Sequence, residues 1–258
     1  GNLQRMHIRN MYAAMPGIVK LRANGFLANL DDTKRLKADV SVNANAANLD
    51  FVKAMLPKSI TSTVNIPHGI GLRGHMRLDG PAIAARFNAT QGGGSLGGNV
   101  SLNTRRMAYA ATRAARRFPI SHFLKGQPIH PFTGTIAARG QGTDFRSSHA
   151  TLNATANINR LQYAAYNLDN IKVSARLGGG HLIVNADSRN KLFKGLIGID
   201  ALTSTKFIQA TLSCDLAHAD LQRLGFVKDP LNVAVCGQVD VASDLKKFYL
   251  AQGSLSDI

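Results

Sequence analysis

Strict alternation of apolar and polar residues is the feature that most limits what this chain can fold into. It is clearest over residues 149–158, where Ala150, Leu152, Ala154 and Ile158 alternate with His, Thr and Asn residues. Successive side chains of a β-strand point to opposite sides, so such a run places apolar groups on one face and polar groups on the other. The run therefore predicts one strand of a two-faced sheet.

The same alternation recurs along most of the chain. We expect roughly a dozen strands of about six to ten residues each, a usual strand length. Because every run has the same two-faced character, the strands together predict one apolar face and one polar face. The clearest further runs cover residues 36–46, 70–79, 171–177, 208–216 and 233–241.

Turn signals rich in Gly, Asn, Asp and Pro separate the alternating runs. Short connections between such runs predict antiparallel hairpins in sequence order, and no long helical pattern interrupts them. We therefore predict an all-β fold, an elongated antiparallel β-meander with short helical inserts. The expected turns lie at residues 24–25, 79–81, 92–94, 97–98 and 178–180.

Three short helical inserts are expected between the strands. Each begins with a residue that favours a helix N-terminus: Asn48 for the insert that ends at residue 56, Ser121 for residues 121–124 and Asp220 for residues 220–225. The alternation of strands and inserts predicts a single elongated repeat region over residues 1–258. Breaks between repeats are expected near residues 47–68, 118–131 and 218–230.

Small side chains dominate the apolar positions. The chain has 24 Gly, no Trp and 6% aromatic residues, and Ala supplies much of its 45% hydrophobic content. Two sheets that pack as a closed sandwich would bury the apolar face without any ligand. Large aromatic residues usually dominate such cores, and the runs continue as one meander, so an open trough with an apolar groove is an alternative to the sandwich. Periodicity alone leaves both architectures open.

The chain is strongly basic. It has 31 Lys and Arg residues against 15 acidic residues, a formal net charge of +16 and a pI of about 10.4. Such a charge attracts polyanions such as nucleic acid or anionic headgroups. Single-strand binders interleave cations with aromatic platforms, in which this chain is poor, so no nucleic-acid partner is expected. We predict a basic face, near anionic headgroups, at Arg105, Arg106, Arg113, Arg116 and Arg117.

No arrangement of residues predicts catalysis, a cofactor or a metal site. The eight His residues lack carboxylate or thiol partners at ligand spacing, and the Gly clusters precede strands instead of a phosphate-binding helix. Cys214 has the apolar parity of its run and Cys236 the polar parity, which argues against a disulfide between them. The sequence contains no run of about 18 apolar residues, so no membrane span is predicted. We therefore expect a protein that is not an enzyme.

Three stretches of the chain resemble the AsmA-like family, and within it the TamB-type translocation and assembly module proteins of the bacteroidete type. They are residues 25–36, residues 49–57 with 66–74, and residues 159–177, which is similar to the strand, tyrosine turn, Leu-Asp-Asn and strand of AsmA-like repeats. The likeness covers nearly the whole chain. It implies a trough-shaped "β-taco" of stacked strands with an apolar interior.

The resemblance also implies a function in the cell envelope. Family members are anchored in the inner membrane, cross the periplasm, and move phospholipid towards the outer membrane or aid outer-membrane protein assembly. This chain would be a periplasmic, interior part of such a protein, with phospholipid acyl chains and a BamA-like or TamA-like barrel protein as partners. A structural or adhesive β-repeat protein with a closed dry core and a polyanion-binding β domain are the alternatives. The expected groove-lining residues are Val40, Val42, Leu72, Leu78, Leu152, Ile158, Val173, Leu212 and Val235.

Overall fold

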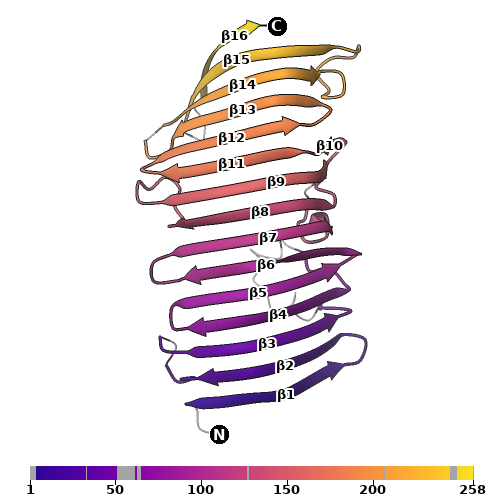
Figure 1. The fold of residues 1–258 in the computed structure, drawn as a ribbon, viewed down its shortest axis with the longest axis vertical. Helices are drawn as coiled ribbons and strands as arrows, with labels where there is room; N and C mark the ends of the chain where they lie inside the picture. The colour runs from indigo at the N-terminus through magenta and orange to yellow at the C-terminus, as the bar shows by residue number, and fades with distance from the viewer. Residues whose placement is uncertain are drawn as a thin grey trace. The chain divides into compact units, whose positions relative to one another are not determined.

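The computed structural model describes residues 4–32, 34–50, 62, 65–126, 128–205, 207–244 and 249–257. Strands make up 68% of the described residues and helical residues 2%, so the predicted all-β class is confirmed. The strands, labelled as in Figure 1, are β1 (Arg5–Met15), β2 (Val19–Ala28), β3 (Lys37–Ala46), β4 (Ile70–Asp79), β5 (Ala82–Gln91), β6 (Gly94–Asn103), β7 (Ala108–Phe118), β8 (Phe132–Gln141), β9 (Thr151–Tyr163), β10 (Tyr166–Leu168), β11 (Ile171–Gly178), β12 (His181–Arg189), β13 (Phe193–Leu202), β14 (Ile208–Asp220), β15 (Asn232–Ser243) and β16 (Tyr249–Asp257).

The strands form one open sheet of 16 strands. Along the path from β1 to β16, neighbours in the sheet are neighbours in the sequence, as Figure 1 shows, and the short strand β10 pairs only with β9. The sheet does not close on itself. The predicted antiparallel meander is therefore confirmed, with more strands than the roughly one dozen expected.

The chain divides into two compact units. Unit 1 comprises residues 1–105, 109–135 and 161–165, and unit 2 comprises residues 106–108, 136–160 and 166–258. Strands β1–β6 belong to unit 1, together with nearly all of β7. Strands β11–β16 and most of β9 belong to unit 2.

In unit 1 the pairing of the strands places the apolar positions of each strand on the same side of the sheet. Val42 of β3 lies opposite Ala23 of β2 and Gly74 of β4, and Gly74 lies opposite Phe87 of β5. The other pairs of these strands are arranged alike, because directly paired residues of antiparallel strands lie on the same face of the sheet. The paired positions on this side of β1–β6 include no charged residue. We call this side the apolar face and the opposite side the polar face.

Unit 2 has the same two-faced arrangement. Ile199 of β13 lies opposite Val184 of β12 and Leu212 of β14, and Leu212 lies opposite Val239 of β15. The paired positions on this apolar face of β9 and β11–β15 again include no charged residue. The alternation in the sequence therefore becomes a continuous apolar surface within each unit.

Two of the predicted turns lie inside strands instead. Gly25 belongs to β2, with φ of 149°, and Gly98 belongs to β6. A Cβ atom at Gly25 would lie 2.0 Å from the backbone oxygen of Asp39, and one at Gly98 would lie 2.1 Å from that of Thr112. The turn predictions at these positions are therefore wrong, because these glycines allow adjacent strands to approach closely. The turns predicted around Gly80, Gly92 and Gly179 do form.

The inserts contain less helix than predicted. The second insert is one 3-10 turn, Ile120–His122, which follows Pro119 without a side-chain cap, so the capping role of Ser121 is wrong. Pro119, with its restricted φ, takes the N-cap position two residues before Ser121. The third insert consists of turns at residues 221–225, so the helix predicted there is wrong. Asp220 still begins it with a side-chain hydrogen bond, since its Oδ1 accepts from the backbone N–H of Arg223 at 3.0 Å. Most of the first insert, from residue 51 to 56, lies outside the described residues.

Longer connections separate groups of strands. Residues 47–69 join β3 to β4, residues 119–131 join β7 to β8, and residues 221–231 join β14 to β15. These are the regions in which repeat breaks were expected. Residues 142–150, between β8 and β9, form a further connection that the sequence pattern did not predict.

Candidate functional site

The apolar faces include all nine predicted groove-lining residues. Four of them lie on β3 and β4 of unit 1 and share its apolar face: Val40, Val42, Leu72 and Leu78. Within each unit, the side predicted from the alternation is therefore the side on which the strand pairing places these residues. The other five share the apolar face of unit 2 and are Leu152, Ile158, Val173, Leu212 and Val235.

The longer side chains of the apolar faces remain partly exposed. Met76 is 43% exposed and Leu72 38% in unit 1, and Leu212 is 41% exposed in unit 2. Neighbours in the same sheet cover the flanks of each side chain and leave its outer part accessible to water. A continuous and partly exposed apolar surface of this kind marks an interaction surface.

The buried apolar residues are mostly alanines of the same faces. Ala23, Ala38 and Ala46 are buried in unit 1, as is Ala201 in unit 2. A methyl group is short enough to be covered by longer side chains on adjacent strands. All described strands belong to one sheet, so no second sheet packs on them to make a sandwich core.

The five arginines predicted as a basic face do not lie together on one face. Residues 105–106 belong to the turn between β6 and β7, whereas residues 116–117 lie near the opposite end of β7. Arg113 lies between them, with its guanidinium carbon 5.0 Å from the centre of the Phe87 ring. Because Phe87 belongs to the apolar face of unit 1, Arg113 places a cation on that face.

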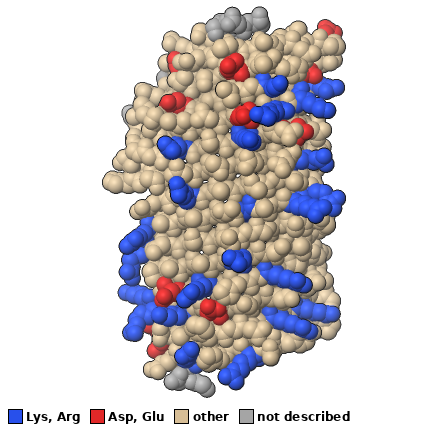
Figure 2. Space-filling model, in the orientation of Figure 1, with Lys and Arg blue, Asp and Glu red and all other residues tan. Residues whose placement is uncertain are grey.

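The polar face of unit 1 is rich in cations. Asp39 Oδ1 lies 2.7 Å from His75 Nε2, and Asp79 lies 3.4 Å from Lys37 Nζ. On the side that Figure 2 shows, Lys and Arg side chains are spread over the N-terminal strands with few Asp side chains between them. Five cations on polar positions of β2, β4 and β5 have no ion-pair partner among the described carboxylates: Lys20, Arg22, Arg73, Arg77 and Arg86.

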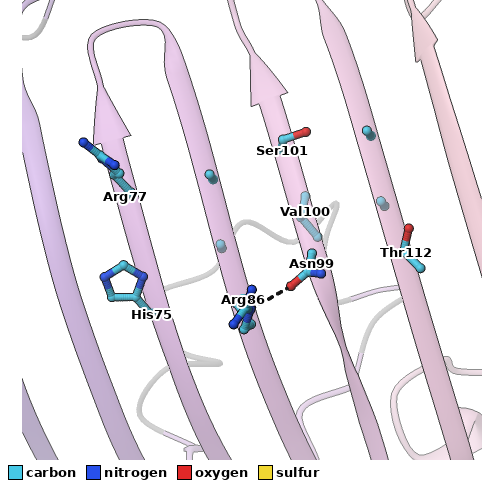
Figure 3. A pocket seen from close by; sticks show the side chains of 11 residues that line it. His75, Arg77, Arg86, Asn99, Val100, Ser101 and Thr112 are labelled. Carbon is cyan, nitrogen blue, oxygen red and sulfur yellow. Dashed lines mark hydrogen bonds between the residues drawn. The ribbon is translucent and has the colours of Figure 1, made fainter.

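A hollow opens on the polar face of unit 1, across β4–β7. Its volume is about 570 Å³. No carboxylate lines it, and Arg side chains from two adjacent strands do. The polar side chains at the hollow, seen in Figure 3, are those of His75, Arg77, Arg86, Asn99, Ser101 and Thr112.

Two hollows on the polar face of unit 2 differ in charge from that of unit 1. One, of about 700 Å³, has Lys172 together with Asp187 and Asp215. The second, of about 380 Å³, has Asp200 and Asp240 and no Lys or Arg. Both therefore present carboxylates, whereas the hollow of unit 1 presents guanidinium groups.

Other chemistry-bearing side chains are dispersed. Cys214 lies opposite Gly237 and Cys236 lies opposite Asp215, so the two thiols belong to opposite faces, as their parity predicts. Among the described residues, no group of three or more His, Cys, Asp or Glu is placed to hold a metal ion. Nor does the described part of the chain include a helix long and apolar enough to cross a membrane.

Sequence reasoning missed two features of these faces. Arg113 has the same parity in β7 as Ala111 and Ala115, so the alternation already contained the signal for its place on the apolar face. The hollow of unit 1 had no such signal. It depends on Ala84 lying between longer residues of neighbouring strands, which only the register reveals.

Comparisons of the chain with models of protein families, with curated proteins and with solved structures found no match.

Proposed function

We propose that the apolar faces shield the acyl chains of phospholipids and that the chain acts as a passive module of lipid transfer. The main support is the partly exposed apolar face of each unit, which has no charged residue at its paired positions in β1–β6 or in β9 and β11–β15. Removing an acyl chain from water stabilises it by about 0.8 kcal/mol per CH₂ group. About ten such groups on this surface would contribute roughly 8 kcal/mol.

Arg113 favours an anionic lipid over a neutral one. Its guanidinium group lies over Phe87, on the apolar face of unit 1. A guanidinium group binds phosphate through two parallel hydrogen bonds, which makes it suited to a phospholipid headgroup. A lipid whose acyl chain lies across the strands beside Phe87 would meet this cation at its headgroup.

The wider setting of the proposal rests on the family resemblance of residues 25–36, 49–57 with 66–74, and 159–177. In that setting the sheet curls into a trough in the periplasm, as part of a longer protein anchored in the inner membrane. The module would transfer phospholipid between the inner and outer membranes, or assist outer-membrane protein assembly together with a BamA-like or TamA-like barrel protein.

The first test places a charge on either face of the same strand. Val42→Asp in unit 1 introduces a carboxylate on the apolar face, and Ser41→Asp introduces one on the polar face one residue away. We expect Val42→Asp to weaken binding of a fluorescent phosphatidylglycerol by about tenfold or more, because an acyl chain cannot solvate a carboxylate. Ser41→Asp should leave the affinity within about twofold. Leu212→Asp and Ser213→Asp form the same matched pair in unit 2.

Circular dichroism and a thermal melt show which variants are folded. A photocrosslinking side chain at Leu72, compared with one at Arg73, gives a second readout that does not require a buried charge. Crosslinks to lipid should form from position 72 and not from position 73, since the two positions face opposite sides. Equal losses of affinity in folded members of each matched pair, or equal crosslinking from both positions, would show that the proposal is wrong.

A further inference from the structure

The hollow on the polar face of unit 1 arises because small side chains lie between long ones. Ala84 of β5 lies opposite Arg77 of β4 and Ser101 of β6. Ala110 of β7 lines the same hollow. Both alanines have short side chains, and the longer residues that line the hollow with them are labelled in Figure 3.

The two arginines of the hollow have unused hydrogen-bonding capacity. Arg86 donates one hydrogen bond, from Nε to Asn99 Oδ1 at 3.2 Å, and its terminal nitrogens bond to no described residue. Arg77 lies opposite Asp39 in the register, but Asp39 Oδ1 bonds to His75 Nε2 instead. Among the described residues, Arg77 has no hydrogen-bond or ion-pair partner.

His75 also lines the hollow, and its Nε2 pairs with Asp39 Oδ1, whereas the other polar groups at the hollow are neutral. Asn99 presents an amide, and Ser101 and Thr112 present hydroxyl groups. Guanidinium groups flanked by neutral donors match the oxygens of a phosphate, to which charge-assisted hydrogen bonds are about twice as strong as neutral ones. The absence of a lining carboxylate distinguishes this hollow from the two in unit 2.

We propose that this hollow is a binding site for a phosphate monoester, with Arg77 and Arg86 as its two cationic ligands. The volume of about 570 Å³ leaves room for the group to which the phosphate is attached. That group is either a small soluble molecule or a lipid headgroup, since both present the same phosphate chemistry. The site lies on the polar face, so it does not depend on the acyl-chain binding proposed for the apolar face.

The test measures binding of two phosphate probes to the purified chain. Glycerol 3-phosphate is titrated by calorimetry, and vesicles of phosphatidic acid in phosphatidylcholine are titrated by sedimentation. Arg77→Gln and Arg86→Gln should each weaken binding by about tenfold, and the double variant by about a hundredfold, through loss of charge-assisted hydrogen bonds. Arg86→Lys should retain an intermediate affinity because it keeps the charge and loses the planar fork.

Arg73→Gln is the matched control. Arg73 lies on the same strand and the same face as Arg77 and has the same charge, but it does not line the hollow. Its substitution should leave binding of both probes within about twofold. Saturable binding of either probe supports the site, and the probe that binds identifies the source of the phosphate.

Three results would overturn the proposal, provided that circular dichroism shows folded variants. The first is that neither probe binds at millimolar concentration. The second is that Arg73→Gln weakens binding as much as Arg77→Gln, which would indicate a diffuse effect of charge. The third is that single-stranded DNA displaces the probes and all three arginine substitutions weaken DNA binding equally, which would indicate a nucleic-acid surface instead.

Discussion

Unit 1 and unit 2 each have an apolar face of their own, but their polar faces differ in charge. Unit 1 has 17 Lys and Arg residues against five Asp residues, and unit 2 has 14 against ten. The polar positions of β4 and β5 in unit 1 include Arg73, Arg77 and Arg86. In unit 2, Asp200 of β13 and Asp240 of β15 lie beside a hollow.

The apolar surface is a property of many residues together, whereas the charge of the polar face depends on single residues. The proposed acyl-chain binding depends on the whole apolar surface of a unit, because a charge placed within it, as at Val42 or Leu212, would interrupt the contact with an acyl chain. Arg113 of β7 lies over Phe87 and is proposed to meet the headgroup instead. A side chain on the polar face meets water, so its charge can change without affecting the fold. The polar face is therefore where the two units can bind different ligands on the same framework.

The largest expected effect concerns a glycine in each unit. Gly25 and Gly195 have φ of 149° and 144°, and a Cβ atom at either would lie 2.0 Å or 2.1 Å from a backbone oxygen of the next strand. We expect Gly25→Ala and Gly195→Ala each to lower the free energy of unfolding by about 3 kcal/mol or more. Urea denaturation measures the loss, and hydrogen exchange locates it.

Gly178→Ala is the control for the glycine substitutions, since nothing lies within 4 Å of its Cβ position. Its effect should stay within about 0.5 kcal/mol. The comparison of the units predicts that Gly25→Ala reduces exchange protection in β1–β6 more than in β11–β15. Equal loss of protection in both sets of strands would show that the two units unfold as one.

A smaller effect is expected for a buried amide in each unit. Asn190 is 3% exposed, and its Nδ2 donates to the backbone oxygens of Asn167 (2.9 Å) and Asp169 (3.1 Å). Its Oδ1 accepts a hydrogen bond from the N–H of Leu192 at 2.8 Å. We expect Asn190→Ala to cost about 2–3 kcal/mol of stability, because the substitution leaves these groups without partners. Chemical denaturation measures the change.

Gln91 is the counterpart of Asn190 in unit 1. Its Nε2 donates to the backbone oxygen of His68 at 3.3 Å, and its Oε1 lies 2.9 Å from His122 Nδ1. With fewer and longer hydrogen bonds, Gln91→Ala should cost about 1 kcal/mol. Asn88→Ala, at an exposed position of β5, is the control and should be nearly neutral. A larger loss for Gln91→Ala than for Asn190→Ala would contradict this ranking.

The smallest effects are expected for acidic residues on the polar faces. Asp79 pairs with Lys37 in unit 1, with both side chains more than half exposed, and Asp200 pairs with His181 in unit 2. We expect Asp79→Asn and Asp200→Asn each to change stability by less than about 0.5 kcal/mol, since exposed ion pairs contribute little. A loss above about 1 kcal/mol in urea denaturation would show that polar-face charges do support the fold.

Much of the fold followed from residue patterns, and the exceptions have physical causes. The alternation of residues 149–158 correctly predicted the exposed and covered sides of β9. The turn predicted at residues 24–25 was wrong because glycine, which lacks a Cβ atom, favours both tight turns and the close approach of two strands. The alternation in β1 is interrupted at Asn10, where φ is 50° and the register shifts by a bulge. Such a bulge hides a strand from a period-two pattern.

Of the candidate sites, the sequence predicted the apolar face but not the hollow on the polar face of unit 1. The nine predicted lining residues share a face within each unit because parity along a strand is a local property, which register then preserves across strands. The basic cluster was close in sequence, yet β7 separates its arginines by strand length and by face. The hollow that contains Arg77 and Arg86 involves residues from four strands, so no single segment contains its signal.

The sequence by itself determined that this chain forms two-faced antiparallel strands in order, because side-chain parity and short connections are local properties. Tertiary structure alone decided which residues of different strands meet. The pairing register placed Arg113 over Phe87 on the apolar face and set Ala84 between Arg77 and Ser101. What a charged side chain can bind depends on the residues beside it, and in a sheet most of these residues belong to other strands.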